Sequence, residues 1–379
     1  MNLSDYREQL DKIDSELVRL FEKRMEIAKQ VAVLKSTTGK PVLDRGRERE
    51  ILSRVTDSVT EELQTYTGIL YSTIFDLSRS YQRRQLKQDS GLEREILKAQ
   101  AETRDIFPTK ATVACQGIEG AYSQQAVDRL FSLPNILYFQ RFEGVFQAVE
   151  QGLCRYGVLP IENSLHGSVT EVYDLMKRYS FFIAKSLKLR VRHMLLGRQG
   201  ASPSKITEIF SHEQALGQCG KFLKSLGNVK VTVCENTAVA ARMVAQSQRD
   251  DWAALSSREC AALYGLSVLS DDVQDNDSNY TRFICISKGL EIYPGANRIS
   301  LMLSVPHKPG SLYRLISRIS SQGININKIE SRPIHGSDFE FMFYFDLETS
   351  VGQQNIISLL SELSSEIEQF TFLGNYSEV

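Results

Sequence analysis

The chain has 379 residues, more than a single hydrophobic core usually serves, and so two or three domains are expected. Hydrophobic residues make up 42% of the chain and charged residues 24%, as in an ordinary soluble globular protein. A formal net charge of -1 gives no electrostatic reason to expect nucleic-acid binding.

The six cysteines are scattered without a C-x-x-C pair, which argues against a metal site and against a disulfide framework. The N-terminal residues do not follow the pattern of a signal peptide, and no stretch approaches 18 consecutive apolar residues. We therefore expect a cytoplasmic protein without a membrane span, with small molecules or other protein chains as its partners.

A long amphipathic helix is predicted at the N-terminus. Its apolar residues keep a heptad and fill both seam positions, at Leu3, Tyr6, Leu10, Ile13, Leu17, Leu20, Ile27, Val31 and Leu34. About 32 residues of helix span roughly 48 Å, longer than a small domain is wide, so the seam needs a partner helix. Arg24 stands where the register expects an apolar residue, and a cation there is costly unless an anion meets it. We favour a functional role for Arg24, whereas Arg7 and Lys35, which flank the seam, are more simply interpreted as solvated charges.

Two further helices are predicted before residue 90. Polar residues fall on the apolar stripes of both: Asp44, Arg47 and Glu48 on the first, and Ser78 and Gln82 on the second. Helical bundles build binding sites from polar side chains projected inward by facing helices. Surface ion pairs on the first helix and satisfied core polar groups on the second are the simpler alternatives.

Over residues 1 to about 90 the sequence resembles the all-helical class of chorismate mutase. The matching positions are Arg7, Arg24, Lys35, Asp44, Arg47, Glu48, Ser78 and Gln82, in the family's order. The resemblance implies that chorismate is the substrate and that neither a cofactor nor a metal is needed. It also implies a homodimer or higher homo-oligomer in which the long first helices pair, so that Arg7 serves the partner subunit's site.

The rearrangement of chorismate needs no nucleophile, so the protein can contribute only positioning and electrostatic complementarity to the transition state. On this hypothesis Arg7 and Arg24 hold the substrate's two carboxylates. Lys35 and Gln82 stabilise the ether oxygen, and Glu48 fixes the ring hydroxyl. Asp44 and Arg47 orient these neighbours.

Residues 91–108 are expected to form a charged, partly helical linker, and strand and helix signals alternate over residues 109–288, as in a parallel sheet. The stretch 157–176 reads as a strand, a polar turn and a helix, and Pro160 is expected to end the strand because proline lacks a ladder donor. Just after it come four hydrogen-bonding side chains, Glu162, Asn163, Ser164 and His166. Open α/β sheets bind ligands at this place, although an ordinary capped turn is the alternative. The chain crosses between two lobes twice, which suggests a cleft.

The segments GIEGAYS, LPIENSLHGSV, SHEQAL and NYTRF resemble the signatures of prephenate dehydratase, in the family's order. This resemblance implies a two-lobed α/β fold like that of type II periplasmic binding proteins, with prephenate as substrate. It makes Thr281 the catalytic residue and places Ser123, Glu162, Asn163, Ser164, His212 and Gln218 along the cleft. An acid must assist the leaving hydroxyl, and residue chemistry alone would nominate Glu162 or His212 for that role.

The last 80 residues follow a β-α-β-β-α-β order, the ferredoxin-like arrangement. They resemble an ACT regulatory domain, which implies that phenylalanine binds as a feedback inhibitor. The matching positions are Gly310, Ser311, Leu312, Glu330, Ser331, Arg332 and Pro333. The expected organisation is a mutase domain at 1–90, the linker at 91–108, a dehydratase domain at 109–288 and the regulatory domain at 297–379.

Together the resemblances imply one multidomain enzyme of phenylalanine biosynthesis, which turns chorismate into prephenate and prephenate into phenylpyruvate. The competing hypothesis is a ligand sensor without catalysis, in which a solute-binding domain lies between a dimerising coiled coil and a regulatory domain. The sensor explains a cleft, but it does not explain Arg24 together with Lys35, Glu48 and Gln82.

Overall fold

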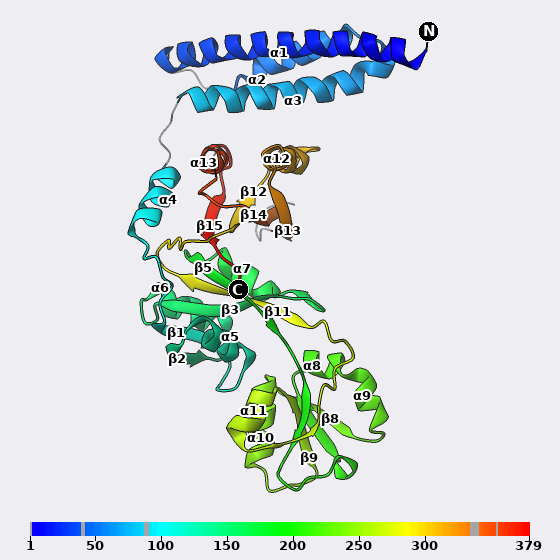
Figure 1. Ribbon diagram of the computed structural model, residues 1–379, viewed down its shortest axis with the longest axis vertical. Coiled ribbons are helices and arrows are strands. Elements are labelled where there is room, and N and C mark those ends of the chain that lie inside the picture. The colour runs from blue at the N-terminus through cyan, green and yellow to red at the C-terminus, as the bar shows by residue number, and fades with distance from the viewer. Residues whose placement is uncertain (1, 39–41, 87–90, 334–340, 354) are drawn as a thin grey trace. The chain divides into compact units, whose positions relative to one another are not determined.

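The computed structural model describes residues 2–38, 42–86, 91–333, 341–353 and 355–379 (Figure 1). It divides into two compact units, Met1–Arg94 with Ile357–Glu366, and Glu95–Ile356 with Ile367–Val379. Across the described ranges, no helix is long and apolar enough to cross a membrane.

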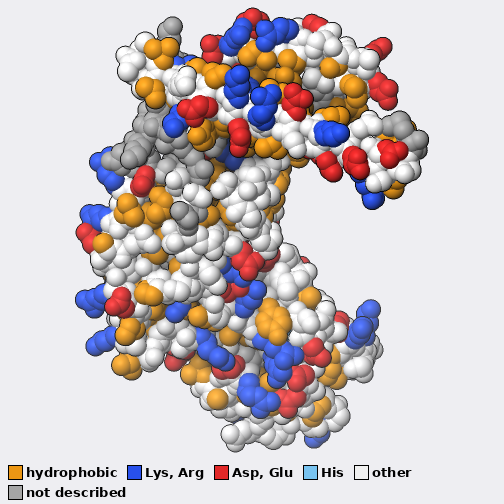
Figure 2. All heavy atoms as spheres, turned by 45° about the horizontal axis from the view of Figure 1, so that its top comes forward, with side chains coloured by type: hydrophobic (Ala, Val, Ile, Leu, Met, Phe, Trp, Pro, Cys, Tyr) orange, Lys and Arg blue, Asp and Glu red, His pale blue; other side chains and the backbone are white. Residues whose placement is uncertain are grey.

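The N-terminal unit contains the three predicted helices, α1 (Leu3–Thr38), α2 (Arg45–Asp57) and α3 (Glu61–Leu86). α1 and α3 lie side by side, and α2 lies against α3 (Figure 1). Ala28 and Ala32 are buried, which marks the inner face of α1. The nine seam residues are each 38% to 66% exposed, so within one chain the seam faces outward. Figure 2 shows hydrophobic side chains gathered on the surface of this unit, at the top of the view.

A fourth helix, α4 (Gly91–Glu102), occupies the segment predicted as a partly helical linker. It leads into the first lobe, whose sheet has the order β2-β1-β3-β11-β5, with β4 paired to β3. The strands are β1 (Lys110–Gln116), β2 (Leu133–Phe139), β3 (Tyr156–Asn163), β4 (Gly167–Ser168), β5 (Phe182–Arg190) and β11 (Tyr280–Ser287). The helices are α5 (Tyr122–Leu130), α6 (Phe142–Glu150) and α7 (Thr170–Met176). β1 pairs in parallel with β2 and β3, but β11 runs antiparallel between β3 and β5, so the sheet is mixed and not parallel throughout.

The expectation that Pro160 ends its strand is wrong. β3 continues through Pro160 to Asn163, and the register with β11 shifts between Arg282 and Phe283, opposite this place. A local irregularity in the ladder is where a strand tolerates a residue without an N–H donor. The polar residues Glu162 and Asn163 therefore lie on the strand and not in a turn after it.

The second lobe is built on a sheet with the order β10-β6-β9-β7-β8. Its strands are β6 (Met194–Gly197), β7 (Glu208–Ser211), β8 (Lys230–Val233), β9 (Trp252–Ser256) and β10 (Ser267–Ser270). Its helices are η1 (Pro203–Lys205), α8 (Glu213–Gln218), α9 (Gly220–Ser225), α10 (Thr237–Gln246) and α11 (Arg258–Tyr264). The chain enters this lobe through residues 191–193 and leaves it through residues 271–279, which confirms the two predicted crossings.

The C-terminal segment has the predicted β-α-β-β-α-β order, and its antiparallel sheet has the strand order β13-β14-β12-β15. Its elements are β12 (Arg298–Ser304), α12 (Ser311–Ser320), β13 (Asn325–Pro333), β14 (Phe341–Glu348), α13 (Ile356–Glu366) and β15 (Phe370–Tyr376). The ferredoxin-like topology follows from this order and these pairings.

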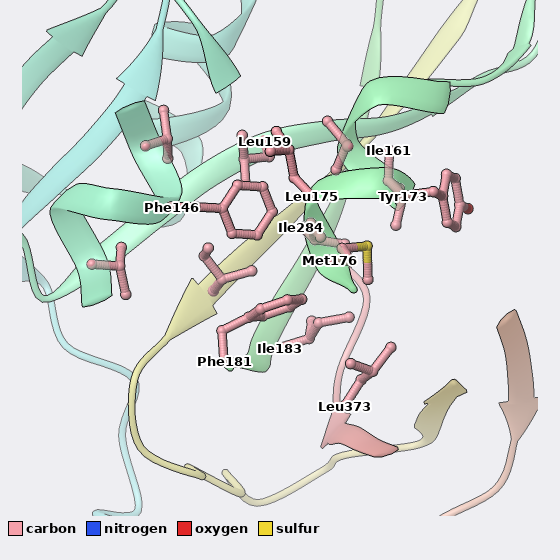
Figure 3. Close-up of a cluster of buried hydrophobic side chains, with 14 of the residues drawn as sticks. Phe146, Leu159, Ile161, Tyr173, Leu175, Met176, Phe181, Ile183, Ile284 and Leu373 are labelled. Carbon is pink, nitrogen blue, oxygen red and sulfur yellow. The ribbon is translucent and has the colours of Figure 1, made fainter. Parts of the chain in front are cut away.

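The C-terminal sheet shares a hydrophobic core with the first lobe. Leu373 of β15 lies in one cluster with Phe146, Leu159, Met176 and Ile183 (Figure 3). The last residues also extend the lobe's sheet, because the Ser186 N–H donates to the Ser377 carbonyl at 3.0 Å and the Val379 N–H donates to the Ser186 carbonyl at 2.9 Å. The first lobe and the C-terminal sheet are therefore packed as one body.

Candidate active sites

The helical unit places two buried polar atoms without a hydrogen-bond partner among its described residues. One is Nη1 of Arg24, whose guanidinium carbon lies 5.8 Å from the centre of the Phe75 ring. The other is Oε1 of Gln82, a side chain only 8% exposed whose Nε2 donates to the Ser78 hydroxyl at 3.2 Å. Leaving a buried polar atom unsatisfied costs about 1–3 kcal/mol, so each of these two atoms is a candidate contact for a polar ligand.

Lys35 lies on α1 and Glu48 on α2, and both side chains already have polar contacts within the helical unit. The Lys35 ammonium donates to the Val42 carbonyl at 2.7 Å, and the Glu48 carboxylate is bonded to Arg79, which also bonds Asp76. Sequence reasoning missed Arg79. It follows Asp76 by three residues, which is the spacing of an ordinary ion pair on the surface of a helix, so nothing in the sequence suggested a role in the site. In the structure it fixes the position of Glu48.

Three predicted mutase residues do not reach this site within one chain. Asp44 caps α2 by accepting the Arg47 N–H at 2.9 Å, and the Arg47 guanidinium pairs with Glu50 at 2.7 Å in an exposed position. Arg7 is exposed and precedes Arg24 by about 26 Å of helix at 1.5 Å per residue. It therefore cannot contact a ligand that Arg24 holds in its own chain.

The two-lobed segment brings Thr281 and Asn163 together. The two residues are partners in the antiparallel ladder of β11 and β3, and the Asn163 Nδ2 donates to the Thr281 Oγ1 at 3.0 Å. Thr281 accepts this bond and donates to no described residue, so its own hydroxyl hydrogen is available to a ligand. The same Nδ2 donates to the Asn279 Oδ1 at 2.8 Å.

Gln218 reaches from α8 of the second lobe to this cluster. Its Oε1 accepts from the Asn279 Nδ2 at 2.9 Å and lies 2.9 Å from the His193 Nε2, while its Nε2 lies 3.0 Å from the His166 Nδ1. Sequence reasoning missed Asn279 and His193, which lie in the two crossings between the lobes. The polar run before Tyr280 could have indicated Asn279, but nothing local indicates His193.

Ser164, Ser123 and His212 have different surroundings. The Ser164 hydroxyl donates to the Ser278 carbonyl at 2.8 Å and accepts from the Tyr280 N–H at 3.0 Å, so it fixes the segment that precedes Thr281. Ser123 is buried in the first turn of α5. His212 caps α8, and burial lowers its pKa, which leaves the ring neutral at pH 7. A neutral imidazole is a poor proton donor, and so the structure disfavours His212 as the general acid.

Glu162 is not brought together with Thr281, although the sequence placed both along the cleft. Neighbouring residues of a strand point to opposite faces, so Glu162 and Arg282 lie on the reverse face of β3 and β11 from Asn163 and Thr281. There the Glu162 carboxylate pairs with the Lys328 ammonium of β13 at 2.8 Å. An acid held in this way is turned away from the Thr281 hydroxyl.

The predicted effector residues fall into two groups. Gly310 precedes α12 with a φ of 78°, a left-handed conformation that a side chain would strain, and Ser311 is buried next to it, while Leu312 is half-buried. On β13 the side chains of Glu330 and Arg332 point to the first lobe. Alternation puts Ser331 and Pro333 on the other face of that strand.

The contacts of Glu330 and Arg332 are specific. The Ser168 hydroxyl donates to the Glu330 Oε2 at 2.6 Å, and Arg332 binds the two oxygens of Asp174 at 3.2 and 3.1 Å. Glu162, Gly167 and Ser168 of the first lobe, with Asn327, Lys328 and Glu330 of β13, line a polar groove between the two.

The sequence matches two protein families, Chorismate mutase type II over residues 6–83 and Prephenate dehydratase over residues 113–290. It is 34% identical over 311 residues to Arogenate dehydratase/prephenate dehydratase 2, chloroplastic, of Arabidopsis thaliana, which covers 79% of this chain and 81% of that protein. A crystal structure of prephenate dehydratase in complex with L-Phe from Arthrobacter aurescens matches with a TM-score of 0.65 at 26% identity, over 70% of this chain and 90% of that one.

Some relatives align along nearly the whole chain. The Bifunctional chorismate mutase/prephenate dehydratase of Escherichia coli (strain K12) is 30% identical over 378 residues, which is 98% of this chain and 95% of that protein. The alignment includes the helical unit, both lobes and the C-terminal sheet, and so the chain belongs to the family of bifunctional chorismate mutase/prephenate dehydratases.

Proposed function

We propose that this chain converts chorismate into prephenate in its helical unit and prephenate into phenylpyruvate in its two-lobed segment, as an enzyme of phenylalanine biosynthesis. The observation that carries the proposal is that each unit holds polar groups whose hydrogen-bonding capacity is unfilled. Among the residues that the structure describes, Nη1 of Arg24 and Oε1 of Gln82 have no hydrogen-bond partner in the first, and no acceptor takes the Thr281 hydroxyl hydrogen in the second. The corresponding domain extents are 1–90, 109–288 and 297–379, with a linker at 91–108.

In the mutase, the guanidinium of Arg24 holds one substrate carboxylate, and Lys35 lies on the side of the ether oxygen. Gln82 assists Lys35 once its amide turns over. The Ser78 hydroxyl then donates to the Gln82 Oε1, and Nε2 is released towards the ether oxygen, which needs a donor as its bond to carbon breaks. Glu48, oriented by Arg79, binds the ring hydroxyl.

The second carboxylate is held by Arg7 of another copy of the chain. The exposed seam of α1 supports this dimer, because nine large apolar side chains at heptad spacing are a surface that a second α1 can cover. Arg7 and Arg24 of one chain are also too far apart along α1 to contact the same ligand.

In the dehydratase, Thr281 gives its hydroxyl proton to the departing hydroxyl of prephenate, which leaves as water while the carboxylate leaves as carbon dioxide and the ring becomes aromatic. The Thr281 oxygen then regains a proton from solvent water. An aliphatic hydroxyl is a weak acid, but its donation strengthens when it accepts a hydrogen bond from a neighbour. The Asn163 amide supplies that bond at 3.0 Å. Asn163 is therefore the residue that makes Thr281 an effective donor.

Phenylalanine regulates the dehydratase through the C-terminal segment, which we assign as an ACT domain. The relative from Arthrobacter aurescens binds L-Phe, and in this chain Lys328, Glu330 and Arg332 of β13 contact Glu162, Ser168 and Asp174 of the first lobe. Inhibition requires that phenylalanine bind one conformation of the chain more tightly than another. These contacts can couple the conformation of the C-terminal segment to that of the first lobe.

A single assay separates this proposal from the ligand sensor. Purified chain supplied with chorismate alone should produce phenylpyruvate, with prephenate as a transient. A sensor would bind ligand and leave chorismate unchanged, which would overturn the proposal.

A further inference from the structure

A buried histidine between the lobes is joined to Thr281 by an unbroken series of side-chain hydrogen bonds. His193 is 2% exposed and lies in the first crossing, where its N–H donates to the Gln274 side chain at 2.9 Å and its carbonyl accepts from the Val273 N–H at 3.0 Å. Its Nε2 is 2.9 Å from the Gln218 Oε1. From there the bonds continue through two asparagines to the Thr281 hydroxyl.

The backbone fixes the direction of this series. The Asn163 Oδ1 accepts the N–H groups of Leu165 and His166, at 3.0 and 3.1 Å, so its Nδ2 must be the atom that faces Thr281 and Asn279. The Asn279 Oδ1 is therefore used as an acceptor, and its Nδ2 faces the Gln218 Oε1. No amide in the series can turn over without placing two donors or two acceptors against each other.

The series determines which ring nitrogen of His193 carries the hydrogen. Because Gln218 presents an acceptor, the His193 Nε2 must carry a hydrogen and donate it. The ring's Nδ1 is buried without a hydrogen-bond partner among the described residues, so nothing there competes for the ring's orientation. The Tyr122 ring packs beside it in a T-shaped arrangement, with the two ring centroids 6.1 Å apart.

We propose that His193 is a positioning residue of the dehydratase, whose Nε2–H holds the Gln218 amide and, through Asn279 and Asn163, directs the hydroxyl hydrogen of Thr281 towards the substrate. The inference rests on the proposed role of Thr281. His193 does not touch the substrate, and the Gln218 Nε2 at 3.0 Å from His166 makes the same amide a contact between the two lobes. Loss of the His193 donor should therefore lower kcat more than it changes KM.

The test compares three replacements of His193 in the full-length chain. In H193Q the amide nitrogen stands three bonds from Cβ, as Nε2 does in histidine, and it keeps the donor. H193M has a similar length without a donor, and the amide of H193N is too short to reach Gln218. With prephenate as substrate, H193Q should keep kcat within about threefold, and H193M and H193N should each lose about tenfold or more, the equivalent of one hydrogen bond.

Controls separate a failure of this inference from a failure of the proposed function. Thermal unfolding of each variant checks the fold, and H193N provides a polar replacement if H193M does not fold. Dehydratase activity retained in T281A would remove Thr281 from the mechanism, and the inference with it. If T281A is inactive, the role of Thr281 stands. Equal kcat values in H193Q, H193M and H193N, whether close to that of the wild type or far below it, would then overturn the role of the His193 Nε2 donor.

Discussion

At the residue scale, the proposed role of Thr281 depends on which atom of its hydroxyl group already has a hydrogen-bond partner. Its oxygen accepts from Asn163 and its hydrogen is free, so the residue is set to donate. The two motifs that contain Asn163 and Thr281 could be recognised in the sequence, but the direction of the bond between them could not, because it depends on the backbone N–H groups of Leu165 and His166.

Replacing Asn163 by Asp tests this direction with almost no change of shape. A carboxylate at this position has only acceptors, so the Thr281 hydroxyl would donate to it and not to the substrate. We expect N163D to lower kcat with prephenate by about tenfold or more, while chorismate mutase activity is unchanged. A kcat equal to that of the wild type would show that Thr281 does not need its hydrogen.

The acid stability of the chain should also depend on His193. Burial lowers the pKa of this histidine, against a smaller opposing effect of the hydrogen bond with Gln218, whereas in the unfolded chain its pKa is about 6.5. Below pH 6.5 the unfolded state binds a proton that the folded state does not, so stability falls as the pH drops from 6.5 towards the folded pKa.

The variant H193Q cannot take up that proton, so its melting temperature should fall less than that of the wild type between pH 7.5 and pH 5.5. The side chains that face the ring, Tyr122 and Gln218, carry no charge in this range. His212, whose pKa is also lowered by burial, and the carboxylates are present in both proteins and cancel in the comparison. Parallel pH profiles would mean that His193 remains protonatable in the folded state.

At the scale of elements, β3 and β11 each carry a site residue on one face and a charged residue on the other. Arg282 is 6% exposed and is bonded to Asp346, and its NH2 group donates to the Tyr376 hydroxyl at 2.8 Å. Its Nε is 3.0 Å from the Glu378 carboxylate, close enough for an ion pair although the N–H is not aligned for a hydrogen bond. The C-terminal segment therefore contacts both strands on the face opposite Thr281 and Asn163.

The sequence could not show this arrangement. Alternation predicts that a strand has two faces, but it does not say which face carries the site and which packs against the C-terminal segment. Glu162 was expected beside Thr281 on chemical grounds, and only the register of β3 with β11 reveals that it points to Lys328. The helical elements were more predictable. The seam of α1 and the polar stripes of α2 and α3 follow from spacing alone, since a helix fixes its own geometry.

Lys328 is the contact through which we expect phenylalanine to act on the cleft. Replacing it by Met keeps the length of the side chain but releases Glu162 and Ser168, so K328M should need several-fold more phenylalanine for half-inhibition, with little change of kcat in its absence. K224M, which removes an exposed lysine from α9, is the matched control. Unchanged inhibition in K328M would place the coupling elsewhere.

At the scale of the whole molecule, the C-terminal segment is part of the structure of the dehydratase as well as its proposed regulator. Tyr344, Leu373 and Tyr376 share a core with Ile183 of the first lobe, and Ser377 and Val379 pair with β5. Deleting this segment would expose apolar surface and leave Arg282 without its carboxylates, so point variants are the better probes of regulation.

The exposed seam of α1 makes assembly testable through the mutase. In the proposed dimer, R7A removes a cation that serves the neighbouring chain, and Q82A removes an amide that serves its own chain. After subunit exchange, a mixed dimer should contain one intact site and regain mutase activity that neither parent has. Continued inactivity of the exchanged mixture, with dimers shown to have formed, would mean that Arg7 does not act across the interface.

We propose that one chain holds two independent active sites, and measuring each half-reaction in Q82A and T281A shows whether they are independent. Q82A should lose chorismate mutase activity by about a hundredfold or more and dehydrate added prephenate at the wild-type rate, because Gln82 and Thr281 lie in different units. T281A should convert chorismate at the wild-type rate and accumulate prephenate. Equal loss of both half-reactions in either variant would contradict the account.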